Sequence, residues 1–281
     1  GLHGGQRAES GVRRMYMEKN LSDVKRMDAT VCTLLGVPCR VQAAGANELV
    51  LNAAQKAFGA PRCDRVFLYN PDAVALWIYE KYAARFAPLE EKAPLRLPVQ
   101  TVYPPVTPVC FASMYSGLSP KEHGIQKYEK PVLTVKTMFD ELPAAGRRTA
   151  IVSTEGDSIS KIFLERDVDY FIYKTKEECN AKAMELIQKD EYACMVLYNG
   201  DYDHWMHRTG PEGRRALRAL EENIATFCAL HEAIAHDTAL AFAPDHGCHK
   251  VYGFFGTHGL DEPCDRETVH FWSFLPHQEK K

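Results

Sequence analysis

Apolar residues recur at helical spacing along much of this 281-residue sequence. The clearest case is the segment 213–236, which predicts one long amphipathic helix. Its apolar face would carry Leu217, Leu220, Ile224, Phe227, Leu230 and Ile234. The same spacing predicts helices over residues 20–35, 47–58, 73–86, 134–142 and 177–189.

Short apolar runs bounded by turn residues alternate with these helices. They predict buried strands over residues 65–70, 97–102, 148–153, 170–173, 193–198, 238–243 and 269–275. This alternation predicts a three-layer α/β/α sandwich with a mostly parallel central sheet. The sequence has no repeat or linker, so we expect residues 1–281 to form a single domain, with residues 1–14 mobile.

The charge and the cysteines narrow the classes of function. A formal net charge of −3 with scattered basic residues gives no electrostatic footprint for a nucleic acid polymer. The nine cysteines have no regular spacing, so they predict reduced thiols and a cytoplasmic location rather than a disulfide framework. No apolar run approaches the ~20 residues that span a bilayer. We therefore expect no membrane partner.

Thr107 stands where a predicted strand gives way to a helix. Pro104 and Pro105 end the strand, and Pro108 suits the first turn of a helix because its missing N–H is not needed there. Free backbone N–H groups at a helix N-terminus favour a phosphoryl group beside a nucleophile. Two readings of the Thr107 hydroxyl follow, a helix N-cap or a nucleophile.

Three other strand ends are followed by aspartate and histidine. The residues are Asp72 after the first strand, Asp203 and His207 after the fifth, and Asp245, His246 and His258 after the sixth. Ligands of open α/β sheets bind at the carboxyl ends of the strands, so we expect these side chains to converge. Taken singly, each has an ordinary reading, such as Asp72 as the N-cap of the next helix or the others as polar loop residues.

Three carboxylates and three imidazoles, with the Thr107 hydroxyl shared, can hold two divalent metal ions of about four ligands each. This set of ligands favours Zn²⁺, with Mn²⁺ or iron as alternatives. Two ions about 4 Å apart can activate a hydroxyl and polarise a phosphoryl oxygen during displacement at phosphorus. The pattern therefore indicates phosphoryl chemistry with Thr107 as the nucleophile.

Several of these segments match motifs of a known family in the family's order. They are Val106-Thr107-Pro108 with the segments 116–120 and 122–125, the Asp-x-x-x-His-x-x-Gly-Pro pattern from Asp203 to Pro211, and Asp245-His246-Gly247. The chain resembles the alkaline phosphatase superfamily, in its type I phosphodiesterase and nucleotide pyrophosphatase branch. The resemblance covers roughly residues 65–275 and implies an alkaline phosphatase-like fold.

The resemblance also implies roles for individual residues. One metal ion would be bound by Asp203, His207 and His258. The other would be bound by Asp72, Asp245 and His246. Thr107 would attack phosphorus and form a covalent phosphothreonine, which water then hydrolyses.

Two departures from the family pattern bear on the ligands and the substrate. Pro71-Asp72-Ala73 stands where the family has Asp-Gly, and Tyr128 stands where nucleotide pyrophosphatases have an asparagine that contacts a phosphoryl oxygen. The Tyr128 phenol could donate one hydrogen bond there, and Lys127 could bring a charge nearby. In the alternative reading, the Lys127 side chain is simply solvated.

We therefore expect a metal-dependent hydrolase of phosphoric esters, whether phosphodiesters, phosphomonoesters or phosphonates. Its partner would be a small phosphorylated or phosphonate substrate. One alternative is a phosphomutase-type phosphoryl transferase, and another is a metal-binding pseudoenzyme that acts as a binding module. The sequence leaves the natural substrate and the oligomeric state open.

Overall fold

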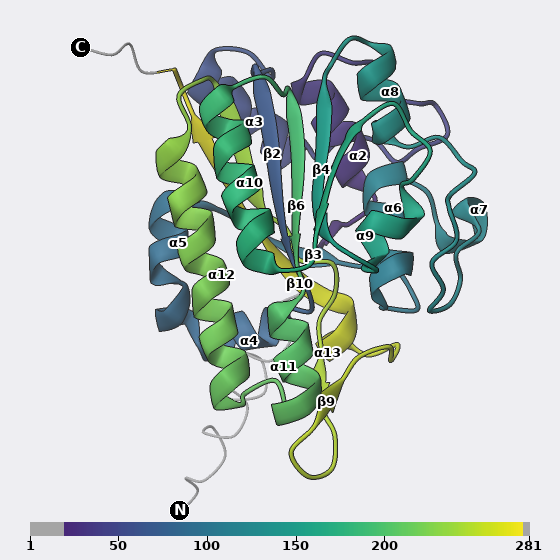
Figure 1. The fold of residues 1–281 in the computed structure, drawn as a ribbon, viewed down its shortest axis with the longest axis vertical. Coiled ribbons are helices and arrows are strands. Elements are labelled where there is room, and N and C mark those ends of the chain that lie inside the picture. The colour runs from purple at the N-terminus through teal and green to yellow at the C-terminus, as the bar shows by residue number, and fades with distance from the viewer. Residues whose placement is uncertain (1–19, 278–281) are drawn as a thin grey trace, which may run out of the picture.

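The structure, a computed structural model, describes residues 20–277. Within these residues the main sheet has eight strands (Figure 1). Their order across the sheet is β1 (Ser22–Asp23), β3 (Leu95–Gln100), β10 (Glu267–Leu275), β7 (Thr238–Phe242), β2 (Arg65–Pro71), β6 (Cys194–Asn199), β4 (Thr149–Thr154) and β5 (Asp169–Tyr173). The segment 1–14, which we predict to be mobile, lies outside the described residues.

The strands of the sheet are parallel except β10, which runs antiparallel to β3 and β7. At its centre, Leu68 of β2 lies opposite Val196 of β6 and Ala241 of β7. Parallel neighbours bring their carboxyl ends to the same edge. The prediction of a mostly parallel central sheet is confirmed.

Helices cover both faces of the sheet (Figure 1). On one face lie α2 (Arg26–Leu34), α3 (Glu48–Phe58), α6 (Thr107–Ser116), α8 (Met138–Ala144) and α9 (Ser158–Ile162). On the other lie α4 (Leu76–Lys81), the 3-10 helix η2 (Ala83–Phe86), α5 (Ala87–Lys92), α10 (Lys176–Lys189), α11 (Asp201–Thr209) and α12 (Arg214–Ala233). The remaining elements are α7 (Pro120–His123), β8 (His249–Lys250), β9 (Gly256–Thr257) and α13 (Pro263–Arg266).

Successive residues of β2 enter opposite cores. Val66 and Leu68 are buried beneath the helices of one face, and Phe67 and Tyr69 beneath those of the other. Because both faces are covered, the strand is a continuous apolar run rather than an alternating one. The predicted three-layer α/β/α sandwich is confirmed. None of the helices in the described part of the chain is both long and apolar enough to cross a membrane.

Three predicted helices begin later in the structure than predicted. The helix predicted over 134–142 begins at Met138, after its N-cap Thr137. The other two are displaced by contacts between distant segments. The helix predicted over 73–86 is divided into α4 and η2 and starts late, because Ala73 has a φ of 65° and its amide donates to Asp245 Oδ1 at 3.1 Å. The helix predicted from residue 20 begins at Arg26, because Ser22 and Asp23 pair with β3 instead. In both cases a partner far along the chain overrides the local periodicity.

Candidate metal centre

The predicted ligands lie on elements that end at one edge of the sheet. Asp72 follows β2, and Thr107 is the first residue of α6. Asp203 and His207 lie one turn apart on α11, which follows β6. Asp245 and His246 come shortly after β7, and His258 directly follows β9. Figure 1 shows α11, β9 and α13 together beyond this edge.

One group consists of Asp72, Asp245 and His246, all three buried. His246 Nε2 lies 3.2 Å from Asp72 Oδ1 and 3.2 Å from Asp245 Oδ2. The Thr107 hydroxyl joins this group, since Oγ1 lies 3.2 Å from both Asp72 Oδ2 and His246 Nε2. These contacts bring the predicted nucleophile and three predicted ligands together.

The second group consists of Asp203, His207 and His258. Asp203 Oδ1 lies 3.2 Å from His207 Nε2 and 3.3 Å from His258 Nε2. The two groups are neighbours, because the rings of His246 and His258 have centroids 4.0 Å apart. The His207 side chain is 41% exposed, so this second group is the one open to solvent.

The geometry of both groups fits metal ions. Among the described residues, Asp203 Oδ1 and Asp245 Oδ2 are buried without a hydrogen-bond partner, although buried carboxylate oxygens normally have one. Two donor atoms each about 2.0–2.1 Å from a tetrahedral zinc ion lie about 3.3 Å apart. The separations of 3.2 to 3.3 Å between carboxylate and imidazole atoms match that spacing.

In all three histidines, Nε2 is the nitrogen available to a metal ion, because Nδ1 contacts a backbone carbonyl. Nδ1 of His207 contacts the Gly256 carbonyl at 3.0 Å, and Nδ1 of His258 contacts the Pro105 carbonyl at 3.0 Å. Nδ1 of His246 lies 2.7 Å from the Gly247 carbonyl. A proton on each Nδ1 leaves Nε2 with its lone pair directed into the site, as in many protein metal centres.

The carboxylates and imidazoles perturb one another strongly. Burial and the neighbouring Asp72 raise the pKa of Asp245 well above its usual value. Burial alone would lower the pKa of His246, but Asp245 and Asp72 raise it to about 10. Burial alone would raise the pKa of Asp203, but His207 and His258 hold it below its usual value. Without metal ions, the buried negative charge therefore has to be balanced by protons.

Two glycines allow the close approaches that the site requires. A Cβ on Gly247 would lie 2.0 Å from the Cys264 carbonyl oxygen, so only glycine lets the Asp245-His246 segment pack against residues 264–265. A Cβ on Gly256 would lie 2.6 Å from Met206 Sδ, so glycine lets β9 lie against α11. The glycine after Asp245-His246 therefore has a steric reason.

Neither Thr107 nor Asp72 is a helix N-cap, which was the alternative interpretation of each residue. The N-cap of α6 is Val106, and the N-cap of α4 is Ala75, neither with a side-chain hydrogen bond. Thr107 instead donates to Asp72. Tyr198, which sequence reasoning missed, donates to Asp72 Oδ2 at 2.5 Å. The sequence could have indicated Tyr198 as a site residue, because it stands at the carboxyl end of a predicted strand.

Lys127 and Tyr128 are not brought to the ligands. Tyr128 is 61% exposed, and its ring lies under Lys130 Nζ at 5.4 Å. Lys127 contacts Glu129 at 3.8 Å. Within the described part of the chain, neither side chain contacts any of the metal-binding groups. Their role as substrate contacts stays a prediction.

A third group of possible ligand atoms joins His249, Cys264 and Asp265. His249 Nδ1 lies 2.8 and 2.9 Å from the two carboxylate oxygens of Asp265, and the Leu260 amide donates to Oδ2 at 2.9 Å. These are hydrogen-bond distances, shorter than the roughly 3.3 Å expected across a metal ion. This group therefore anchors β8 to α13 by hydrogen bonds.

The fold has counterparts among solved structures. An inactive variant of murine ectonucleotide pyrophosphatase/phosphodiesterase 5 in complex with AMP has a TM-score of 0.55 and 15% identity, covering 66% of this chain and 58% of its own. The human protein of the same name has a TM-score of 0.55, 18% identity, and coverage of 66% and 57%. Phosphonoacetate hydrolase from Sinorhizobium meliloti, in complex with phosphonoformate, has a TM-score of 0.50, 17% identity, and coverage of 66% and 56%.

These similarities define the class of fold. The chain therefore shares the fold of these proteins, the alkaline phosphatase-like fold that the resemblance in sequence implies. The chain matches less than two thirds of the length of these proteins. No model of a protein family matches the sequence, and no curated protein matches it.

Proposed function

We propose that this chain is a metal-dependent hydrolase of phosphoric esters that uses Thr107 as its nucleophile. The observation that carries the proposal is the position of the Thr107 hydroxyl. Its oxygen lies 3.2 Å from both Asp72 Oδ2 and His246 Nε2, at the start of α6. Two groups of candidate ligands adjoin it, and each contains one buried carboxylate oxygen without a hydrogen-bond partner. The alkaline phosphatase-like fold supports the same chemistry by analogy.

Each group of ligands would hold one divalent ion. Asp203, His207 and His258 would bind one, and Asp72, Asp245 and His246, with Thr107, would bind the other. Carboxylate and imidazole ligands without a thiolate favour Zn²⁺, with Mn²⁺ or iron also compatible. When bound, the ions would favour the alkoxide form of Thr107 and neutralise charge on the phosphoryl oxygens.

The residues of the chain then account for two displacements at phosphorus. In the first, Thr107 Oγ1 forms a bond to phosphorus while the bond from phosphorus to the leaving group breaks, at oxygen in an ester or at carbon in a phosphonate. The leaving group takes the electron pair of that bond and the proton that the Thr107 hydroxyl gives up. Asp72 orients Thr107 by accepting its hydrogen bond. In the second, the oxygen of water bonds to phosphorus, and the bond from phosphorus to Thr107 breaks and restores the hydroxyl.

The substrate class remains a small phosphodiester, phosphomonoester or phosphonate. Complexes of the structural neighbours with AMP, phosphonoformate and phosphonoacetate support a compact substrate of this kind. Lys127 and Tyr128 remain candidates for substrate contacts, with the Tyr128 phenol donating to a phosphoryl oxygen and Lys127 bringing a charge nearby, since both side chains are exposed. The whole chain would act as one catalytic domain.

The test compares Thr107→Val, which keeps the shape of the side chain, with Thr107→Ser, which keeps the hydroxyl. Turnover of p-nitrophenyl phosphate and bis(p-nitrophenyl) phosphate is measured with Zn²⁺ or Mn²⁺ supplied, alongside the metal content. Thr107→Val should lose at least about a thousandfold in kcat, whereas Thr107→Ser should keep part of it.

Each contrary result has a distinct meaning. Bound metal without turnover in the unmodified chain would indicate a pseudoenzyme. Transfer of the phosphoryl group to another hydroxyl of the substrate, without release of phosphate, would indicate a phosphomutase-type transferase. Equal turnover in Thr107→Val and the unmodified chain would exclude Thr107 as the nucleophile.

A further inference from the structure

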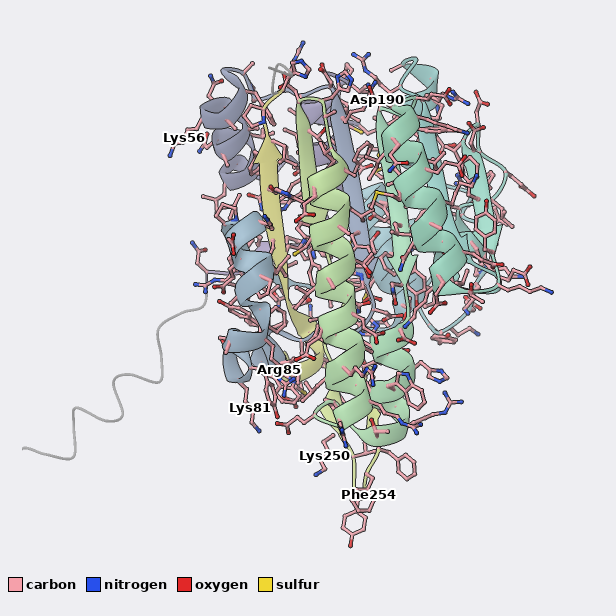
Figure 2. The ribbon with its side chains drawn as sticks, turned by 60° about the vertical axis from the view of Figure 1, so that its left-hand side comes forward. Lys56, Lys81, Arg85, Asp190, Lys250 and Phe254 are labelled. Atoms are coloured by element: carbon pink, nitrogen blue, oxygen red, sulfur yellow. The ribbon has the colours of Figure 1, made fainter. Side chains whose placement is uncertain are left out.

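The loop between β8 and β9 presents three aromatic side chains to solvent. Tyr252 is 103% exposed, Phe254 81% and Phe255 56%. The loop is a formed turn, because the Val251 amide donates to the Phe255 carbonyl at 3.0 Å and Gly253 has a φ of 89°. Figure 2 shows Phe254 projecting from one end of the molecule. We call residues 252–255 the aromatic tip.

Cationic residues lie on the segments that adjoin the aromatic tip. Lys250 precedes it, and Arg208 and Arg214 flank the corner between α11 and α12. That corner packs against the tip, since a Cβ on Gly210 would lie 3.6 Å from the Phe254 carbonyl oxygen. Among the described residues, the side chains of Lys250 and Arg214 form no hydrogen bond or ion pair, and Arg208 contacts His204. One acidic side chain lies at the same corner: Glu212 pairs with Lys81, and Lys250 is close enough to add to the electrostatic attraction on it.

The shape and the charge together favour one kind of partner. Small-molecule sites are concave, whereas the aromatic tip is convex and protrudes. Clustered exposed aromatic rings are uncommon on soluble proteins without an interaction. Aromatic side chains are enriched at the membrane–water interface, and lysine and arginine near it are attracted to anionic lipids. A convex aromatic tip with three cationic residues on the adjoining segments has this combination.

We propose that the aromatic tip inserts into the headgroup region of an anionic lipid bilayer, with Lys250, Arg208 and Arg214 contacting lipid phosphates. This contact is peripheral and needs no spanning helix. It departs from the expectation of no membrane partner, which rested on the absence of a long apolar run. Figure 2 shows Lys250 and Phe254 at the same end of the molecule, opposite Lys56 of α3.

The proposed docking would orient the metal centre. β9 leads from the aromatic tip directly to His258, and α11 carries both His207 and the corner that packs against the tip. Phosphoric esters carried in lipid headgroups would then be presented near the open side of the site. This last consequence rests on the proposed function, whereas the docking itself does not.

The experiment is sedimentation of the protein with vesicles of phosphatidylcholine alone or with added phosphatidylserine. The unmodified chain should bind the vesicles that contain phosphatidylserine, less so at high salt. A variant combining Tyr252→Ser, Phe254→Ser and Phe255→Ser should lose at least about tenfold in affinity. A variant combining Arg208→Gln, Arg214→Gln and Lys250→Gln should lose the preference for phosphatidylserine. The matched control is Leu49→Ser, because Leu49 is 52% exposed on α3.

Several outcomes would overturn the proposal. They are no binding to anionic vesicles at low salt, or equal binding by the serine variant and the unmodified chain. A change from dimer to monomer in the serine variant, without vesicle binding by either protein, would assign the aromatic tip to self-association instead. Vesicle binding without hydrolysis of either p-nitrophenyl substrate would overturn only the proposed function. Unchanged melting temperatures would show that the variants are folded.

Discussion

The Tyr198 hydroxyl donates a hydrogen bond of 2.5 Å to Oδ2 of Asp72, the carboxylate that also accepts from Thr107. Tyr198 is buried, and a Cβ on Gly200 would lie 2.7 Å from its hydroxyl oxygen, so glycine leaves room for this contact. The Asp72 carboxylate is therefore held by Tyr198 from β6 and by Thr107 from α6. Partners of metal ligands orient them and tune their affinity.

Tyr198→Phe should weaken metal binding by roughly 10- to 100-fold, because the ring still fills its place while Asp72 loses a donor. Competition with a chelator measures this affinity. The matched control is Tyr69→Phe, since the Tyr69 hydroxyl donates to Asn223 at 3.0 Å and contacts no metal ligand. An equal loss of affinity in both variants would mean that packing, rather than the contact with Asp72, is responsible.

Asp203→Asn should remove one of two bound ions. Asp203 is the only carboxylate in its group, and its buried Oδ1 faces both His207 and His258. Asp201→Asn is a suitable control, because Asp201 lies on the same helix but pairs with Lys176 at 2.5 Å. Elemental analysis after dialysis should show half the metal content in Asp203→Asn and the full content in Asp201→Asn. Equal metal content in both variants would contradict the assignment.

The sequence predicted the elements that local patterns determine. The apolar face of α12 and the buried run of β2 are visible without knowledge of any partner. The convergence of the aspartate and histidine side chains could also be predicted, because the carboxyl ends of parallel strands lie at the same edge of the sheet. Ser22 and Asp23 were missed as a strand, because their pairing partners in β3 lie more than seventy residues away.

Contacts between segments that are far apart in the chain could not be predicted from the sequence. Ala73 takes a φ of 65° while its amide binds Asp245, and no periodicity reports such a contact. The hydrogen bond from Tyr198 to Asp72 likewise depends on the neighbouring positions of β2 and β6 in the sheet. The pairing of His249 with Asp265 depends on β8 and α13 lying next to each other. Each requires the tertiary arrangement.

Asp28 should make stability depend on pH away from the metal centre. It is 1% exposed and accepts a hydrogen bond of 2.7 Å from Arg40. Burial raises the pKa of Asp28 from 3.8 to about 6, against the opposing effect of Arg40. Between these two pKa values, the folded state therefore keeps a proton on Asp28 that the unfolded state has lost. The resulting stability is complete below the unfolded pKa and is lost as pH rises through about 6.

Relative to Asp28→Asn, the unmodified protein should thus gain on the order of 3 kcal/mol in its free energy of unfolding as the pH falls from about 7 to about 4. Denaturant unfolding of both proteins across this range measures the difference, and the comparison cancels the titration of other carboxyl groups. Arg40 also lies 3.7 Å from Glu141, so its charge has a second partner that Asp28→Asn does not remove. Parallel stability curves for the two proteins would show that Asp28 does not titrate in this window.

Gly247→Ala should disturb both stability and metal binding. The added Cβ would lie 2.0 Å from the Cys264 carbonyl oxygen and 3.1 Å from Ala75 Cβ, and a backbone atom cannot rotate away. The Gly247 amide also donates to the Asp265 carbonyl at 2.8 Å, so relief of the clash would separate two paired segments and move Asp245 and His246. We expect a loss of about 2–3 kcal/mol in the free energy of unfolding.

Gly45→Ala serves as the control, since the nearest heavy atom to its new Cβ is Arg26 Nη1 at 3.7 Å, the end of a flexible side chain. Its effect on the free energy of unfolding should stay within about 0.5 kcal/mol. Chemical denaturation and chelator competition applied to both variants separate the two effects. If Gly247→Ala lowers stability but keeps full metal affinity, the close contact with Cys264 supports the fold without positioning His246. If both quantities fall while Gly45→Ala changes neither, the glycine that follows Asp245-His246 is part of how the metal centre is held in place.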